Sequence, residues 1–339
     1  MTQAALYEML RNKYNIGDFF IVAYLSNVFG SEKLDLKGFN QKISDNPNLG
    51  VWVDYAFSTN RRGREFAQNV RPLFPHNARR YLDVGSAYGG FLIGFMELGL
   101  EVKGIEYSEN MVNMSRANFH DYGLQNTTLK GDILDKALLM QLGKFDVITC
   151  IDVIEHVDNV TSAIQNMVDL LNPGGILMLQ MPNKNSISNI LSDPHFGLFG
   201  ITLLGHAEAK AFYFSHFPRS NYYDVNEYLE QPRYLNLLSG MACEAWAQPP
   251  VVPTSLLRKA CLAPRFIAHL LKFLFNRNVM LPLGIRLKTA LMAWLHISNF
   301  VLQLPLALLL PKLRSALKVK YADDAWFIVG RKKDDKRDG

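Results

Sequence analysis

Short apolar runs alternate along the middle of the chain with stretches that have helical periodicity. Strands are predicted at residues 81–83, 101–105, 145–150 and 176–181, and residues 129–132 end a further strand. Before the last of them, residues 158–171 place apolar side chains at helical spacing, and Asn172-Pro173-Gly174-Gly175 closes that helix. Strands that alternate with helices are typical of an α/β fold with a mainly parallel sheet.

The turn after the first of these strands is the most informative run of the chain. Residues 81–90 read YLDVGSAYGG, and Gly85 and Gly89 let the backbone bend sharply and approach a ligand closely. A dinucleotide loop needs free amides for a pyrophosphate, whereas Asp83 beside the first glycine would repel a phosphate and attract a cation. S-adenosylmethionine (SAM) matches this turn, because it carries an ammonium, a sulfonium and an adenosine but no phosphate.

Two more acids follow strands at positions that suit a nucleoside. Glu106 ends the second strand 21 residues after Gly85, near the interval of about 20 residues at which an acid meets ribose hydroxyls. Asp132 ends the third strand, where its carboxylate can accept from an adenine amino group. A structural turn, a helix cap or a solvated acid would explain each of these residues on its own. These explanations would all have to hold at once to account for the whole set of residues.

With these motifs in this order, the chain resembles the class I SAM-dependent methyltransferases, especially the type 11 group that includes ubiquinone-pathway O-methyltransferases. The resemblance covers about residues 58–183 and returns near residues 226–247 and 323–332, which supply the last strands of a Rossmann-like, seven-stranded, mainly parallel sheet. It implies SAM as cofactor. The implied contacts are Asp83, Gly85, Ser86 and Gly89 at the methionine end, Glu106 at the ribose, Tyr107, Asp132 and Ile133 at the adenine, and Ile151 beside the sulfonium.

One position departs from the family's pattern, and two other functions are alternatives. The family usually has glycine where this chain has Ala87, and a methyl group is tolerable there if φ is negative. A nicotinamide-dependent oxidoreductase, using NAD(P) on a similar sheet, is disfavoured because no Gly-x-Gly-x-x-Gly run is present. The departure at Ala87 leaves a non-catalytic membrane adaptor with this fold as the second alternative.

Two histidines are candidate catalytic residues. Methyl transfer needs positioning, and an oxygen acceptor of high pKa also needs a base such as histidine. His156 follows the fourth strand in a Glu-His pair that is frequent in the resembling family; capping or packing is its alternative role. His195 lies in an insertion at residues 184–216. Other side chains there would wall an acceptor pocket or form a structural cover, namely Phe196, His206, Tyr213 and His216.

A metal site is not expected from the sequence. No set of ligating residues has suitable spacing, although Glu155 and His156 with another acid would bind a divalent ion. Cys150, Cys243 and Cys261 are far apart, as expected of small core residues in a reducing compartment.

Charge is strongly segregated along the chain. The net charge is +5, from 36 basic and 31 acidic residues, but no Asp or Glu lies between Glu244 and Asp323. The basic residues of that interval are Arg258, Lys259, Arg265, Lys272, Arg277, Arg286, Lys288, Lys312, Arg314, Lys318 and Lys320. The rest of the chain therefore sums to 25 minus 31, or −6. A basic insert on an acidic enzyme favours an anionic partner.

The same interval is strongly apolar. Residues 289–311 carry no charge, and Phe266, Leu270 and Leu274 share a helical face with Arg265 and Lys272 opposite. Nucleic acid does not need such an aliphatic stretch and is not expected as a partner, whereas a bilayer surface needs apolar area together with cations. A single crossing is excluded, because the flanking strands belong to one sheet. We expect two helices in one leaflet; soluble packing, an oligomer interface and a two-pass hairpin are the alternatives.

These patterns together predict four segments and a location. The segments are a helical cap at 1–57, a SAM-binding core at 58–250, the basic insert at 251–320 and the last strand with a charged tail at 321–339. The N-terminus lacks the order of an export signal, so we expect a cytoplasmic protein that is peripheral on the inner face of the membrane. Its acceptor would be a small molecule or a lipid-linked group, and the sequence sets no oligomeric state.

Overall fold

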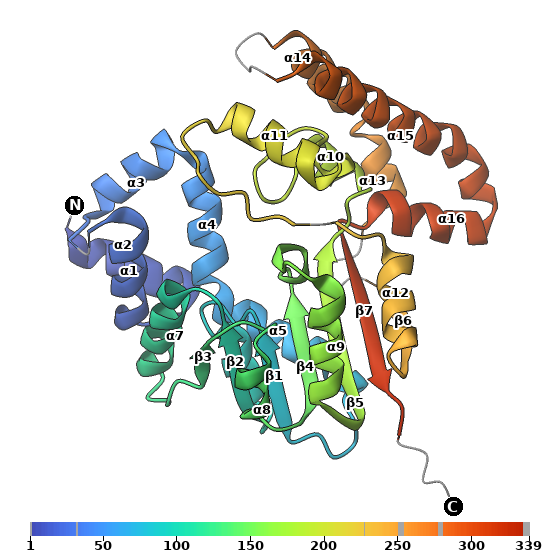
Figure 1. The fold of residues 1–339 in the computed structure, drawn as a ribbon. Helices are drawn as coiled ribbons and strands as arrows, with labels where there is room; N and C mark the ends of the chain where they lie inside the picture. Colours follow the sequence, from blue (N-terminus) through green and yellow to red (C-terminus); the bar gives the residue numbers. More distant parts are fainter. Residues whose placement is uncertain (1, 32, 227, 250–253, 277–280, 335–339) are drawn as a thin grey trace, which may run out of the picture. The chain divides into compact units, whose positions relative to one another are not determined.

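Seven strands form one sheet in the computed structural model, in the order β3-β2-β1-β4-β5-β7-β6 (Figure 1). The strands are β1 (Arg80–Val84), β2 (Glu101–Glu106), β3 (Thr128–Lys130), β4 (Phe145–Ile151), β5 (Leu171–Pro182), β6 (Cys243–Gln248) and β7 (Ala325–Lys332). β1 pairs in parallel with β2 and β4, and β2 pairs in parallel with β3. The register sets Asp83 opposite Gly104 on one side and Thr149 on the other. The predicted seven-stranded α/β fold is confirmed.

Helices precede, separate and follow these strands. The first group is α1 (Gln3–Tyr14), α2 (Asp18–Phe29), α3 (Leu36–Asp45), α4 (Pro47–Phe57) and α5 (Thr59–Val70). Between β1 and β5 lie α6 (Gly90–Met96), α7 (Glu109–Asp121), α8 (Lys136–Met140) and α9 (Val160–Leu170). After β5 come α10 (Ile187–Leu191), α11 (His206–His216), α12 (Gln231–Gly240), α13 (Leu256–Ala260), α14 (Ala263–Phe275), α15 (Leu283–Leu309) and α16 (Pro311–Leu317). Short 3₁₀ or π turns are η1 (Arg71–Leu73), η2 (Ile154–His156), η3 (Ile201–Leu203) and η4 (Lys318–Ala322).

The structure describes residues 2–31, 33–226, 228–249, 254–276 and 281–334, without the side chains of residues 47 and 48. Arg277, one of the basic residues of the insert, therefore lies outside the described residues. One expected detail is wrong, because residues 172–175 begin β5 instead of forming a closing turn. Helix α15 continues past Pro305 to Leu309. A proline removes only one backbone donor from a helix, and neighbouring turns can hold the helix together.

The chain divides into two compact units. Unit 1 contains Met1–Cys150, Gln165–Leu177 and Arg331–Gly339, and unit 2 contains Ile151–Ile164 and Met178–Gly330. Unit 1 therefore holds β1, β2 and β3 together with the N-terminal helices. Unit 2 holds the insertion after β5, strand β6 and the helices of the basic insert.

The N-terminal helices of unit 1 pack on the rest of that unit through an apolar core of their own. Phe20 and Tyr24 from α2 and Phe57 from α4 are buried together with Tyr88 of the turn and Met114 of α7. The Asp121 carboxylate at the end of α7 accepts from the backbone N–H groups of Phe19 and Phe20, at 3.0 and 2.9 Å. These contacts tie the first turn of α2 to α7.

Glycines allow α5 to touch α6 backbone to backbone, directly after the turn that follows β1. A Cβ added to Gly63 of α5 would lie 2.1 Å from the carbonyl oxygen of Gly90. A Cβ added to Gly94, one helical turn later, would lie 2.5 Å from the carbonyl oxygen of Gly63. Contact this close excludes any side chain, so the position of α6 depends on these glycines.

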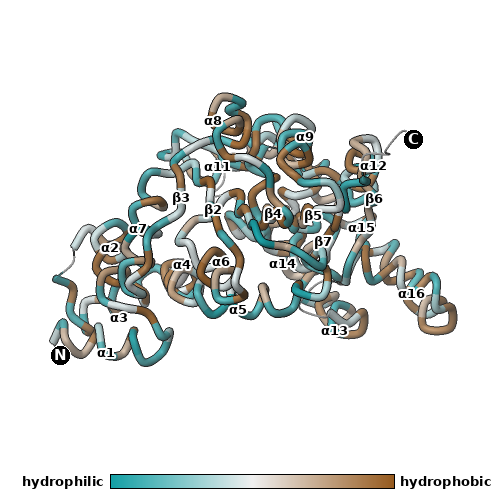
Figure 2. Tube along the Cα trace, turned by 90° about the horizontal axis from the view of Figure 1, so that it is seen from below, coloured by the Kyte–Doolittle hydropathy of each residue, from teal (hydrophilic) through white to brown (hydrophobic). Residues whose placement is uncertain are grey.

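The basic insert of unit 2 has a separate apolar core. Phe266 and Leu270 of α14, together with Ala293, Ile297 and Phe300 of α15, are buried in it. Among the described residues α15 is long and apolar enough to cross a membrane, yet only 22% of its most apolar 18-residue window is buried within the protein. Figure 2 shows hydrophobic stretches along the segment of α15 and α16.

Candidate active site

The turn after β1 is held by its own backbone hydrogen bonds. Gly85 and Gly89 have φ of +78° and +76°, where side chains are disfavoured. The N–H groups of Gly85 and Ser86 both donate to the carbonyl of Ile105 in β2, at 2.8 and 3.1 Å. The N–H of Gly89 donates to the carbonyl of Ser86 at 2.8 Å. Because these amides already have partners, the turn does not offer the row of free N–H groups that holds a pyrophosphate.

Glu106 closes the turn from the neighbouring strand. Its carboxylate accepts from the backbone N–H groups of Ala87 and Ser108, each at 2.8 Å, and the residue is 9% exposed. Ala87 has φ of +43°, so the condition under which its methyl group was expected to be tolerable is not met. The left-handed region costs an L-residue about 1–2 kcal/mol, and the bond to Glu106 helps to hold the residue there.

Asp83 lies buried in β1, within a chain of hydrogen bonds. Thr149 of β4 donates from Oγ1 to Oδ1 of Asp83 at 2.7 Å, and the hydroxyl of Tyr81 lies 2.6 Å from the same Oγ1. Burial raises the pKa of Asp83 to about 7. A cation held against this carboxyl would stabilise its charged form and lower the pKa again.

These groups fit SAM. The hydroxyl oxygen of Ser86 is buried and, among the described residues, has no hydrogen-bond partner. Each carboxylate oxygen of Glu106 accepts one backbone bond and keeps a second lone pair, which a ribose hydroxyl would use. Two carboxyl groups and a free hydroxyl around a turn with occupied amides suit an ammonium and a ribose, and they oppose a phosphate.

The residues expected at the adenine are arranged less closely. Tyr107 follows β2 with its side chain 73% exposed. The Asp132 carboxylate accepts from the N–H of Leu134 at 2.8 Å, and the carbonyl of Ile133 accepts from the side chain of Asn166 at 2.9 Å. The structure thus places these residues after β2 and β3, as expected, while their roles toward adenine stay predictions.

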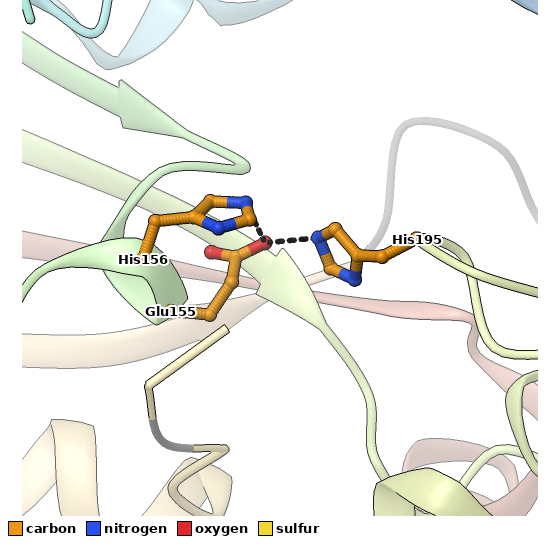
Figure 3. A group of neighbouring side chains, drawn as sticks. All are labelled: Glu155, His156 and His195. Atoms are coloured by element: carbon orange, nitrogen blue, oxygen red, sulfur yellow. Dashed lines mark ion pairs between the residues drawn. The ribbon is translucent and has the colours of Figure 1, made fainter. Parts of the chain in front are cut away.

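The predicted catalytic histidines lie together in unit 2, around a buried carboxylate (Figure 3). Glu155 and His156 belong to η2, four and five residues past Ile151 at the half-buried end of β4. The Nε2 atoms of His195 and His156 lie 3.6 and 4.0 Å from Oε1 of Glu155. Glu155 is fully buried, and among the described residues neither of its oxygens accepts a hydrogen bond. A buried carboxylate without partners normally has a functional reason.

The tautomer of His156 is fixed by the backbone. Nδ1 of His156 lies 2.8 Å from the carbonyl oxygen of Asp224. A carbonyl oxygen only accepts, so Nδ1 carries the proton in this hydrogen bond. The lone pair of the neutral imidazole is therefore on Nε2, the nitrogen that faces Glu155. An imidazole in this tautomer can take a proton at Nε2.

His195 is held from both its backbone and its ring. The Asp193 carboxylate accepts from the N–H groups of His195 and Phe196, both at 3.0 Å. The Tyr228 hydroxyl lies 2.7 Å from Nδ1 of His195. Burial alone lowers the pKa of His195, whereas the Glu155 carboxylate raises it, and the net pKa is raised. The protonated imidazole is therefore favoured beside Glu155.

The same three residues form a set that could hold a divalent ion. One ligand atom from each of Glu155, His156 and His195 lies within 4.8 Å of the others. Two imidazole nitrogens and a carboxylate oxygen suit several first-row metals. The spacing in the sequence did not show this set, because His195 lies 39 residues after His156.

Three of the four other side chains expected to wall one acceptor pocket line two different cavities of unit 2. A cavity of about 350 Å³ is lined by His206, Tyr223 and Tyr228 among others. A second cavity, of about 480 Å³, is lined by Tyr213 and His216. The first shares Tyr228 with His195 and is therefore the one connected to the histidine cluster.

Several residues of both sites were missed in the sequence. Thr149 had a signal, because it is a polar residue in an otherwise apolar buried strand. Asp193, Asp224 and Tyr228 had none, because each acts through a backbone bond or through a residue at least 33 positions away. Their roles depend on the path of the insertion after β5.

Comparison with known proteins gives a consistent family. A family model described as a methyltransferase domain matches residues 57–236, more than half of the 339 residues. The ubiquinone biosynthesis O-methyltransferase of Azoarcus sp. (strain BH72) is 30% identical over 107 residues, covering 32% of this chain and 46% of that protein. The protein of that name from Xanthomonas axonopodis pv. citri (strain 306) is 33% identical over 105 residues, covering 31% and 44%.

The chain thus spans less than half the length of these curated relatives. Among solved structures, a SAM-dependent methyltransferase from Archaeoglobus fulgidus aligns with 84% of this chain and 99% of that chain. The TM-score is 0.45 and the sequence identity is 12%.

Proposed function

The chain belongs to the methyltransferase domain family. We propose that it uses SAM as its methyl donor and that the acceptor is an oxygen atom of a membrane-associated molecule. The cluster of Glu155, His156 and His195 is the observation that carries the choice of oxygen. An alcohol or phenol must lose a proton during methyl transfer, and the cluster contains an imidazole able to take it. The curated relatives are also O-methyltransferases by name.

One set of residues of this chain would bind the cofactor, and another set would act on the acceptor. SAM supplies an activated methyl group when bound. Asp83 and Glu106 provide negative charge and acceptors for its ammonium and ribose, and Ser86 provides a free hydroxyl.

His156 takes the acceptor's proton at Nε2, while the Asp224 carbonyl keeps the other nitrogen protonated. The protonated His195, paired with Glu155, stabilises negative charge that develops on the acceptor oxygen.

The acceptor class follows from the composition of the insert. Helices α14 and α15 expose large apolar side chains, and the interval from residue 245 to 322 contains basic residues but no acidic ones. This combination favours an anionic bilayer surface. A lipid, a prenylated quinone or phenol, or a lipid-linked glycan would all present a hydroxyl there. We therefore place the enzyme peripherally on the cytoplasmic face of a membrane.

Calorimetry with SAM tests the cofactor site. Asp83→Ala or Glu106→Ala should lower SAM affinity by at least about 100-fold, because each removes a buried acceptor worth several kcal/mol. Glu109→Ala, which changes an exposed acid in the first turn of α7, is the matched control and should bind like the wild type. Wild-type affinity in both site variants would refute the assignment.

Incubation of membranes with radiolabelled SAM tests the reaction and the acceptor class. Label should enter the lipid or lipid-linked fraction, and His156→Ala should lower the rate far more than SAM affinity. Label found only in protein would refute the acceptor class. SAM binding without any transfer would favour the adaptor alternative, and an NADH fluorescence titration separates the oxidoreductase alternative.

A further inference from the structure

Helix α15 has two apolar faces, and one of them has no protein against it among the described residues. Its large exposed apolar side chains occur along the whole helix at spacings that place them on one side of it: Leu283, Leu287, Leu291, Trp294, Leu295, Val301, Leu302, Leu306, Leu308 and Leu309. Helix α14 exposes a similar row of Ile267, Leu271 and Phe275. We refer to these two rows as the outer stripes. Rows of large exposed apolar side chains mark interaction surfaces on soluble proteins.

Cations without counterions accompany the outer stripes. Arg258, Arg265, Lys272, Lys312 and Arg314 are exposed, and none of them forms an ion pair with a described residue. Other basic residues of the insert are already engaged, as Lys259 is with Asp324 at 2.6 Å and Lys288 is with Glu208 at 2.7 Å. Free cations beside apolar side chains are complementary to an anionic lipid leaflet, which supplies phosphate groups above a hydrocarbon layer.

The sheet prevents α15 from crossing that layer alone. β6 and β7 precede and follow the insert, and they are neighbours in one sheet. A chain that crossed through α15 would need a second crossing to return. Within the described part of the insert no other helix is long enough, since α14 has 13 residues and about 20 are needed. The geometry therefore favours a helix that lies along the surface.

The opposite face of α15 holds the loop that carries His195. Ile190 of α10 and Phe199 are buried in one core with Phe266 of α14 and Ile297 and Phe300 of α15. The rings of Phe199 and Phe266 lie 5.7 Å apart. His195 is thus on a loop whose two flanks, residues 187–191 and 199, pack against the inner faces of the same helices.

Polar and close contacts tighten this connection. Nε2 of His296 in α15 lies 2.8 Å from the carbonyl oxygen of Asn185, just before α10. A Cβ added to Gly200 would lie 2.6 Å from Cγ2 of Thr289, so the loop backbone rests directly on α15. A change in the position or mobility of α15 must therefore reach the loop.

We infer that the outer stripes of α14 and α15 dock flat on an anionic lipid leaflet, and that docking further restrains the loop that carries His195. This inference rests on the proposed function only for its membrane-borne acceptor. A protein bound in this way meets a lipid acceptor at the surface where the acceptor resides. Docking that holds α15 in place also restrains this loop further, because it restricts the side chains packed on the inner face of the helix.

Vesicle co-sedimentation of the full chain tests docking. Vesicles of phosphatidylcholine with about one third phosphatidylglycerol should bind the wild type, and pure phosphatidylcholine should bind at least about tenfold less. The triple variant Leu291→Gln, Leu295→Gln, Leu302→Gln should lose at least about tenfold in binding to the anionic vesicles. Its matched control changes exposed apolar residues elsewhere, Leu124→Gln and Met140→Gln, and should bind like the wild type.

A charge variant makes the docking test independent of the apolar substitutions. Arg265→Gln with Lys272→Gln should weaken binding and reduce its dependence on salt, because fewer cations face the lipid phosphates. Lys37→Gln with Lys42→Gln, exposed on α3, is the control of equal charge and should change neither. Equal binding to neutral and anionic vesicles would overturn the assignment of an anionic partner. Self-association of the chain through the outer stripes, without any binding to vesicles, would overturn it as well.

Hydrogen exchange of the bound protein tests the coupling. Anionic vesicles should slow amide exchange at residues 193–200 in the wild type and leave it unchanged in the triple variant. Vesicle binding without protection of this loop would overturn the coupling. The proposed function fails separately: loss of SAM binding would remove the methyltransferase assignment without changing vesicle binding, whereas absence of vesicle binding would leave SAM affinity intact.

Discussion

The turn after β1 and the cluster around Glu155 differ in whether their buried backbone and carboxylate groups have hydrogen-bond partners. In the turn, the N–H groups of Gly85, Ser86 and Ala87 have partners, and Glu106 accepts two backbone bonds. In the cluster, the fully buried Glu155 accepts no hydrogen bond from a described residue. The backbone amides of the first region are therefore satisfied within the protein, and only the Ser86 hydroxyl is left free there, whereas the second region retains a buried carboxylate beside an imidazole.

This difference separates positioning from chemistry. A cofactor site gains affinity when its groups are held rigidly before the ligand arrives, so satisfied backbone bonds are an advantage there. A proton-transfer site gains from groups whose charge is poorly compensated, because a low dielectric strengthens their effect on pKa. Substitutions should accordingly damage the first region through its geometry and the second through its electrostatics.

Gly63→Ala should have the largest effect, because it breaks the geometry of the rigid region. The new methyl group would lie 2.1 Å from the Gly90 carbonyl and push α6 away from α5. We expect a loss of about 3 kcal/mol or more in the free energy of unfolding, with SAM binding lost as well. Gly240→Ala, whose Cβ meets no atom within 4 Å, is the control. Chemical denaturation and calorimetry that matched the wild type would show that this contact does not position the turn.

Asp83→Asn should expose the electrostatic cost of the rigid region through pH. Burial raises the folded-state pKa of Asp83 to about 7, above its value of 3.8 in the unfolded chain. Between these values unfolding releases a proton, so the wild type loses stability as pH rises, and the loss is complete above about 7. The variant does not titrate there. Its stability relative to the wild type should therefore increase by about 2 kcal/mol between about pH 5.5 and about pH 8.

Denaturation curves at several pH values measure this difference directly. Glu65→Gln, which removes an exposed acid of α5, serves as the control and should give a difference that does not change with pH. A flat difference for Asp83→Asn as well would show that the carboxyl is ionised throughout, and that its surroundings are already positive without SAM.

Glu155→Gln should separate stability from chemistry in the second region. The free energy of unfolding should change by no more than about 1 kcal/mol, because His195 can lose its proton when the carboxylate is removed and then leaves no unpaired buried charge. The pKa of His195 should fall, because the Glu155 carboxylate is what raises it. Nuclear magnetic resonance titration of His195 measures this shift, and Glu208→Gln is the control. An unchanged His195 titration would contradict the pairing seen in Figure 3.

Ala87→Gly should give the smallest effect. The substitution relieves a φ of +43°, but it also increases the freedom of the unfolded chain. We expect a gain below about 1 kcal/mol in the free energy of unfolding, with SAM affinity equal to or slightly above that of the wild type. A loss of stability would mean that the alanine methyl makes contacts worth more than the relief of strain.

The strands and the cofactor turn were readable from the sequence because their signals are local. Apolar runs predicted β1, β2 and β4 within one or two residues, and the glycines at 85 and 89 do adopt positive φ. The acids at the ends of strands also lie where parallel neighbours must bring them together. Backbone geometry and side-chain polarity over fewer than ten residues are enough to specify such features.

The acceptor cluster and the two faces of α15 were decided only by the tertiary structure. Glu155 and His195 are 40 residues apart, and the partner that fixes the tautomer of His156 is a backbone carbonyl at Asp224. The sequence alone showed that residues 289–311 are largely apolar and carry no charge; which face of α15 is buried depends on where Ile190 and Phe199 pack. Local patterns fix what each segment can bury, whereas the actual partner depends on contacts that only the folded chain brings together.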